Sequence, residues 1–183
     1  MSTVYLIRHG RTCANEQHLY CGSTDLELTE QGIAALKELD YSICPERIYT
    51  SGMKRTEQTL RVLFGEVAHE VHPGFREVDF GDFEMKSYDQ LKELPEYQAW
   101  ITGDNMKNVP PHGESGEEMT CRVMAAFREI CDREEDVLVV THGGVIAAIL
   151  SELFPEEGKN RYQWQPKPGY GYGISGGKYW EIP

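Results

Sequence analysis

Short apolar runs alternate along the chain with longer segments in which apolar side chains recur at helical spacing. The apolar run at residues 4–8 predicts a buried strand, further short strands are predicted at residues 47–49 and 69–72, and residues 136–141 contain the strongest strand signal. The helical spacing predicts helices at residues 29–39, 53–64, 115–130 and 143–154. Strands that alternate with helices need crossover connections. The pattern therefore predicts an α/β fold, a three-layer α/β/α sandwich with a mainly parallel central sheet.

Local signals mark where several of these elements begin and end. Thr29 is the expected N-cap of its helix, and Ser87 and Ser115 each open a capping box. The helix after Ser87 is expected to stop at Pro95. Residues 170–174 and 178–182, joined across two glycines, predict a hairpin. Residues 97–111 show few core signals and predict a short loop or lid within one domain that spans residues 1–183.

Composition and charge exclude several classes of protein. The 183 residues include 30 acidic and 18 basic side chains, for a net charge of −12, which argues against a nucleic-acid partner and against a polybasic membrane-surface protein. No apolar stretch is long enough to span a membrane. The five cysteines form no tight pair, so we expect no disulfide framework, a cytoplasmic location and no structural zinc site.

Two histidines stand in matching contexts. His9 follows the apolar run at 4–8, and His142 follows the run at 136–141; each precedes glycine. The carboxyl ends of parallel strands form ligand sites, so neighbouring strands would bring both imidazoles into one crevice. Two other interpretations stay open, namely strand-end histidines with a structural role and a zinc site. The zinc site lacks a suitably spaced third ligand.

Arginines near the histidines favour a phosphate site. Arg8 precedes His9, and Arg55 falls in the first turn of the helix predicted at 53–64. A helix N-terminus attracts anions, and a guanidinium group can bind two phosphate oxygens at once. Because negative charge spreads over the equatorial oxygens in phosphoryl transfer, this set of residues indicates that chemistry.

The chain resembles the histidine phosphatase superfamily, which has the phosphoglycerate-mutase-like fold. The resemblance begins with Leu-Ile-Arg-His-Gly-Arg-Thr at 6–12 and Asn15. Further matches follow in the family's order: Gly22, Asp25, Leu28-Thr29, Gly32, Ser51, Arg55, Gln58-Thr59, Glu77, Phe80-Gly81, Glu84, Gly113-Glu114-Ser115 and Thr141-His142-Gly143-Gly144. Phe83-Glu84-Met85 departs from the family's frequent Trp-Glu-Gly, so we expect a different turn after Glu84.

The resemblance implies a phosphate-binding role for a first group of residues. His9 would be the nucleophile that forms a phosphohistidine through Nε2, with its Nδ1–H held by an acceptor. Arg8, Arg55, His142 and Asn15 would form the phosphate pocket, and a protonated His142 would add positive charge. Because these groups already supply that charge, we expect neither a metal nor another cofactor.

A second group would act on the rest of the substrate. Glu77 would be the general acid, which protonates the leaving oxygen and later activates water. Asp79, two residues further along, is the alternative carboxylate. Cys21 and Gly22 match positions that face the substrate in relatives. For Cys21, a structural role in the loop competes with this interpretation.

Length decides which branch of the family we favour. Mutases of the family are longer and screen the phosphohistidine from water, whereas this chain offers only residues 97–111 as a lid. We therefore expect a phosphomonoesterase for a small phosphorylated metabolite, similar to small phosphatases such as α-ribazole phosphatase. A phosphoglycerate mutase and an inactive phospho-ligand-binding module are the alternatives.

The negative net charge has to be reconciled with an anionic substrate. Residues 159–178 carry four cations and no acid, at Lys159, Arg161, Lys167 and Lys178. If this segment packs beside the crevice, we expect a positive field at its mouth on an otherwise acidic protein.

Overall fold

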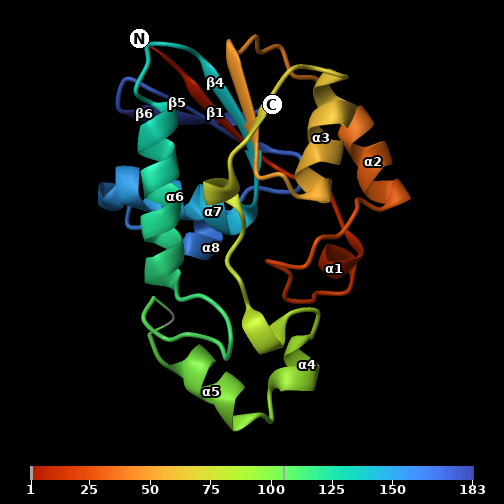
Figure 1. Ribbon diagram of the computed structural model, residues 1–183, viewed down its shortest axis with the longest axis vertical. Coiled ribbons are helices and arrows are strands. Elements are labelled where there is room, and N and C mark those ends of the chain that lie inside the picture. The colour runs from red at the N-terminus through yellow and green to blue at the C-terminus, as the bar shows by residue number, and fades with distance from the viewer. Residues whose placement is uncertain (1, 105) are drawn as a thin grey trace.

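The computed structural model describes residues 2–104 and 106–183, and one six-stranded sheet organises them (Figure 1). The strand order is β3-β2-β4-β1-β5-β6. The strands are β1 (Val4–Arg8), β2 (Arg47–Thr50), β3 (Glu70–Val71), β4 (Val137–Thr141), β5 (Gly171–Ser175) and β6 (Lys178–Ile182). Strands β1 to β4 run parallel, and the β5–β6 hairpin adds antiparallel to β1. The mainly parallel sheet and the hairpin are confirmed.

Helices and short 3₁₀ turns connect the strands. The α-helices are α1 (Cys13–Glu16), α2 (Glu30–Lys37), α3 (Lys54–Phe64), α4 (Tyr88–Leu91), α5 (Pro95–Thr102), α6 (Gly116–Ile130), α7 (Gly143–Leu153) and α8 (Arg161–Trp164). The 3₁₀ turns are η1 (Pro73–Phe75), η2 (Gly81–Phe83) and η3 (Pro155–Glu157). Side chains of Thr29, Ser87 and Ser115 cap α2, α4 and α6, which confirms the predicted helix starts.

The sheet is covered on both faces, as the predicted three-layer sandwich requires. Helices α6, α7 and α8 lie against one face and α2 and α3 against the other (Figure 1). All five residues of β4 are buried, because this central strand has helices on both sides. Leu138 and Val140 pack with Leu60 of α3, whereas Val137 and Val139 join the larger core under α6 and α7.

The prediction of a loop at 97–111 is wrong for its first six residues. The preceding helix α4 already ends at Leu91, and Pro95 begins the new helix α5. Proline is well suited to the first turn of a helix. Tyr97 is fully buried in an aromatic cluster with Phe83, which also includes Trp100. This cluster depends on contacts between α5 and residues 80–91, which helical periodicity within 97–102 does not reveal. Asn105 lies outside the described residues.

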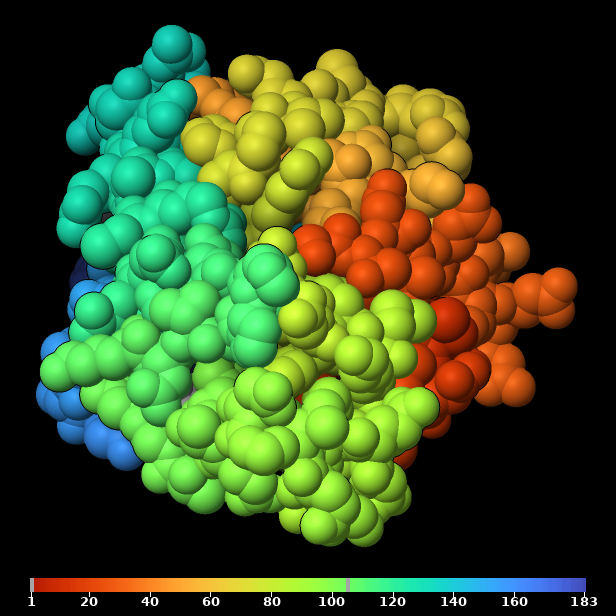
Figure 2. All heavy atoms as spheres, turned by 60° about the horizontal axis from the view of Figure 1, so that its bottom comes forward, coloured from red at the N-terminus to blue at the C-terminus, as the bar shows by residue number. Residues whose placement is uncertain are grey.

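The segment that follows β3 forms one end of the molecule. Figure 2 shows residues of the green segment, which includes α4 and α5, covering this end between the red N-terminal loop and the teal helix α6. Residues 103–104 and 106–111 contain turns but neither helix nor strand. Over the part of the chain that the structure describes, no helix has the length and apolarity needed to cross a membrane.

Candidate active site

Three parallel strands end at the same edge of the sheet and place polar side chains there. Strand β1 pairs with β4 so that Arg8 lies opposite Thr141, and the His9 amide donates to the Thr141 carbonyl at 2.9 Å. The next residues along the two strands are therefore His9 and His142, whose ring centroids lie 5.2 Å apart. The expectation that the two strands are neighbours is confirmed.

The backbone after His9 fixes the state of its imidazole. His9 Nδ1 lies 2.7 Å from the Gly10 carbonyl oxygen, which only accepts, so Nδ1 carries the hydrogen and Nε2 keeps its lone pair. The Gly10 amide in turn donates to Thr59 Oγ1, whose hydroxyl donates to the Arg55 carbonyl. Helix α3 thus anchors the turn that holds the His9 ring.

Burial and two arginines keep both imidazoles neutral. Burial is the largest cause that lowers the pKa of His9 well below 6.5, followed by the positive charges of Arg55 and Arg8. Burial also lowers the pKa of His142 well below 6.5, with Arg55 and Arg8 among the further causes. His142 is therefore neutral in the free protein, whereas the resemblance implied a protonated His142. Its proton would have to arrive with an anion.

The two arginines are themselves held by backbone carbonyls. Arg55, only 1% exposed, donates to the carbonyl oxygens of Thr24 and Gly22 at 2.8 and 2.7 Å. Arg8 donates to the Pro166 carbonyl at 2.8 Å, and burial lowers the pKa of its guanidinium. Both guanidinium groups are therefore fixed in place without a carboxylate of their own.

Two buried polar atoms at this edge have no partner among the described residues. They are Arg8 Nε and His142 Nδ1. The other ring nitrogen, His142 Nε2, lies 2.9 Å from Ser51 Oγ. A buried hydrogen-bonding atom without a partner is costly. Arg8 Nε can only donate, so it favours a bound ligand that accepts hydrogen bonds, and His142 Nδ1 would donate to the same ligand once His142 takes up a proton.

Glu77 sits at the N-terminus of α7. Its Oε2 accepts from the Gly144 amide at 2.9 Å and its Oε1 from the Val78 amide at 3.0 Å. A Cβ on residue 144 would lie 2.3 Å from Glu77 Oε1. Glycine at this position therefore lets the carboxylate approach the helix end beside the histidines.

Asp79 and Asn15 make different contacts from Glu77. Asp79 Oδ1 accepts from Ser23 Oγ and from the Gly81 amide, so this carboxylate holds two loops together. Asn15 Oδ1 accepts from the Thr12 amide at 2.9 Å and thereby caps α1. Asn15 also lines a hollow that includes Arg8. The lining of this hollow includes neither His9 nor His142, so a role of Asn15 in the phosphate pocket stays a prediction.

Cys21 and Gly22 form part of the loop that Arg55 holds. The Cys21 thiol donates to the Thr24 carbonyl, and burial raises the pKa of Cys21 to about 11, so the thiol is neutral and weakly reactive. A Cβ on residue 22 would lie 1.6 Å from the Val78 carbonyl oxygen. Gly22 is thus required for close packing against the segment that follows Glu77.

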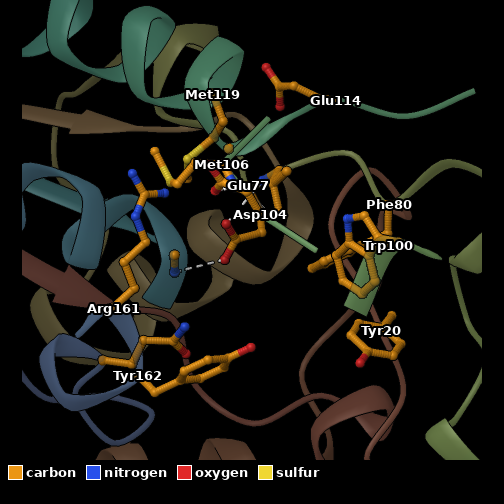
Figure 3. A pocket seen from close by; sticks show the side chains of 14 residues that line it. Tyr20, Glu77, Phe80, Trp100, Asp104, Met106, Glu114, Met119, Arg161 and Tyr162 are labelled. Atoms are coloured by element: carbon orange, nitrogen blue, oxygen red, sulfur yellow. Dashed lines mark hydrogen bonds between the residues drawn. The ribbon is translucent and has the colours of Figure 1, made fainter. Parts of the chain in front are cut away.

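A cavity of about 300 Å³ opens beside Glu77 and Gly144 (Figure 3). Aromatic and sulfur-containing side chains form much of its wall, from Tyr20, Phe80, Trp100, Tyr162, Met106 and Met119. In Figure 3, Tyr162 of α8 lies across the cavity from Tyr20 and Trp100. Sequence reasoning missed this wall because its residues come from separate segments that share no motif.

The predicted positive mouth is only partly realised. Of the four cations between residues 159 and 178, only Arg161 lines this cavity, together with the acidic Asp104 and Glu114. Lys159 instead stacks over Trp164, with its Nζ 4.1 Å from the ring centroid. Within residues 2–104 and 106–183, no three side chains of the His, Cys, Asp or Glu type gather closely enough to hold a metal ion.

The buried imidazoles predict a pH dependence of stability. Unfolding returns both pKa values to about 6.5. Below that pH the unfolded chain therefore binds more protons than the folded chain, and the free energy of unfolding decreases as the pH is lowered. Each histidine adds a slope of up to about 1.4 kcal/mol per pH unit. In denaturant titrations without phosphate, His142→Asn should therefore show a shallower decline than wild type between about pH 6.5 and 5. Equal slopes would contradict neutral burial of His142.

Comparison with known proteins places the chain in a family. Residues 4–169 match the model of the histidine phosphatase superfamily (branch 1). An adenosylcobalamin/alpha-ribazole phosphatase of Salmonella typhimurium is 31% identical over 179 residues, which cover 91% of this chain and 86% of the relative.

Solved structures agree with the sequence match. The alpha-ribazole phosphatase from Shigella flexneri superposes with a TM-score of 0.83 at 25% identity, over 97% of this chain and 93% of its own. A phosphoglycerate mutase from Thermus thermophilus reaches a TM-score of 0.74 at 26% identity, over 94% and 92%. The chain belongs to branch 1 of the histidine phosphatase superfamily and is a phosphatase of that type.

Proposed function

We propose that the protein hydrolyses a small phosphate monoester with His9 as the nucleophile. The observation that carries this proposal is the pair of unpartnered buried atoms, Arg8 Nε and His142 Nδ1, beside a His9 ring whose Nε2 keeps its lone pair. A phosphoryl group bound there would supply oxygens to both unpartnered atoms and lie next to the Nε2 lone pair.

The reaction would run in two steps. In the first, His9 Nε2 attacks phosphorus as the ester P–O bond breaks, and a protonated Glu77 gives its proton to the leaving oxygen. In the second, the Glu77 carboxylate takes a proton from water, which attacks the phosphohistidine and releases inorganic phosphate and the free imidazole. The Gly144 amide orients Glu77, which also lines the cavity that would receive the leaving group.

The wall of the cavity favours a leaving group that carries an aromatic ring. Tyr162 on one side and Trp100 on the other offer flat surfaces for stacking. Arg161 is the single cation of the wall, and Asp104 and Glu114 are anionic, which disfavours a leaving group with a second strong negative charge. Together with the alpha-ribazole phosphatases among its relatives, this supports alpha-ribazole phosphate, a nucleotide with a flat base, as the substrate.

A turnover panel tests this proposal. It contains 4-nitrophenyl phosphate, alpha-ribazole phosphate, phosphoglycerates, sugar phosphates and common nucleotides, with His9→Ala as the background. We expect the highest kcat/KM for alpha-ribazole phosphate, and His9→Ala should lower phosphate release at least a hundredfold. Interconversion of the two monophosphoglycerates without net phosphate release would replace the proposal with a mutase. Ester binding without release would leave a phospho-ligand-binding module.

The role of Glu77 predicts a dependence on the leaving group. Glu77→Gln removes the proton donor, so kcat for an alkyl phosphate should fall at least tenfold more than kcat for 4-nitrophenyl phosphate. Asp79→Asn is the matched control, because it changes a nearby carboxylate that holds loops, and its losses should be similar for both esters. Equal losses across the esters in Glu77→Gln would remove Glu77 as the acid.

A further inference from the structure

One carboxylate joins two segments that lie far apart in sequence. Glu84 accepts hydrogen bonds from the amides of Gly22 and Ser23, both at 2.9 Å, and from the Thr24 hydroxyl at 2.8 Å. It also accepts from the amide of Phe80 at 3.1 Å, on its own segment. Since both carboxylate oxygens accept from these donors, Glu84 fixes the geometry of residues 22–24 relative to residues 80–84.

Arg55 holds the same loop from its other side. Its guanidinium donates to the carbonyl oxygens of Gly22 and Thr24. The peptide groups of residues 22–24 thus lie between a carboxylate that accepts from their amides and a guanidinium that donates to their carbonyls. The position of the Arg55 side chain therefore depends on where Glu84 holds this loop.

The contacts extend to the segment that carries Glu77. Gly22 packs on the Val78 carbonyl so closely that a Cβ would not fit, and the Ser23 hydroxyl donates to Asp79 at 2.9 Å. Residues 22–23 therefore contact Val78 and Asp79, the two residues directly after Glu77. Glu84 holds the loop that lies between the phosphate-site arginine and the carboxylate proposed as the acid.

The turn after Glu84 keeps a backbone conformation that suits glycine. Met85 has a φ of +59°, in the left-handed region that bulky residues avoid. Its amide donates to the Tyr20 carbonyl at 2.7 Å, and the Tyr20 amide donates to the Lys86 carbonyl at 3.0 Å. Met85 thus takes up a conformation that suits glycine, and the turn ties the two segments together directly beside Glu84.

We propose that Glu84 is a positioning residue of the phosphatase: by holding residues 22–24 against residues 77–80, it aligns Arg55 and Glu77 on one bound phosphate ester. The proposal rests on the proposed function, in which Arg55 binds the phosphoryl group and Glu77 protonates the leaving oxygen. Glu84 itself touches neither reacting atom and acts through the loop.

The test replaces Glu84 with glutamine. Glu84→Gln keeps the shape but sets an NH₂ group, which cannot accept, against backbone donors. We expect its inhibition constant for inorganic phosphate to rise about tenfold and kcat to fall at least tenfold, with a larger loss for alkyl than for aryl esters. The matched control is Asp82→Asn, two residues away at an exposed position paired with His112, and it should keep wild-type values.

A double-mutant cycle separates positioning from simple stabilisation. If Glu84 acts through Arg55, then Glu84→Gln should weaken phosphate binding less than threefold when Arg55 is already lysine. Thr24→Val, which removes one of the hydrogen bonds to Glu84, provides a milder variant if Glu84→Gln does not fold. It should weaken phosphate binding two- to fivefold.

Two outcomes would overturn the proposal. One is a lower melting temperature with unchanged kcat and unchanged phosphate affinity per folded molecule, and the other is full additivity with Arg55→Lys. Phosphate affinity does not depend on which residue is the nucleophile. Normal turnover in His9→Ala would therefore reject the proposed function, while the phosphate affinity of Glu84→Gln would still decide the role of Glu84.

Discussion

The site depends on two guanidinium groups that have no carboxylate partner among the described residues. Arg55 is fully buried, and Arg8 is half-buried with its Nε atom out of contact with solvent. Neither Arg8 nor Arg55 forms an ion pair among the described residues, and backbone carbonyls are the only partners that hold them. Unpaired buried charge is unfavourable, so the site favours an anion. Burial, and after it the same positive charges, lowers the pKa of His9 and His142 and keeps both imidazoles neutral. The electrostatic arrangement that attracts a phosphate thus also preserves the lone pair of the proposed nucleophile.

The parallel sheet is what brings these groups together. His9 and His142 follow neighbouring strands, and Arg55 comes from the first turn of α3, which follows β2. All three strands end at one edge, so residues more than 130 positions apart meet there. The net charge of −12 therefore argues against nucleic acid but does not exclude a small phosphate ester. What matters is a local group of cations that burial isolates from the acidic surface.

Sequence reasoning was most successful where a local signal and a long-range constraint agree. Val-Leu-Val-Val before His142 is buried on both sides, so its apolar run identified β4, and the Ser115 capping box located the start of α6. The family motif singled out His9 and Arg55 before any geometry was known. Local periodicity failed at residues 97–102, because Tyr97 of α5 is buried by aromatic residues from other segments.

The cavity wall and the role of Glu84 had no sequence signal of their own. Tyr20 follows α1, Trp100 lies in α5 and Tyr162 lies in α8, and these distant segments meet only in the folded cavity. Glu84 appeared as one match in a motif, and only its hydrogen bonds to residues 22–24 connect it with Arg55. For Asp79 the sequence suggested an acid role, whereas its hydrogen bonds to Ser23 and Gly81 show a carboxylate that holds loops together.

The most direct test of the account is chemical identification of the phosphorylated residue during turnover. Enzyme mixed with excess 4-nitrophenyl phosphate is quenched in alkali within milliseconds, digested at high pH and mapped by mass spectrometry, with His9→Ala and His142→Ala alongside. The account predicts an acid-labile phosphoryl group on the peptide that contains His9, present in His142→Ala and absent from His9→Ala. Phosphate release without any such adduct, or an adduct on another residue, would contradict it.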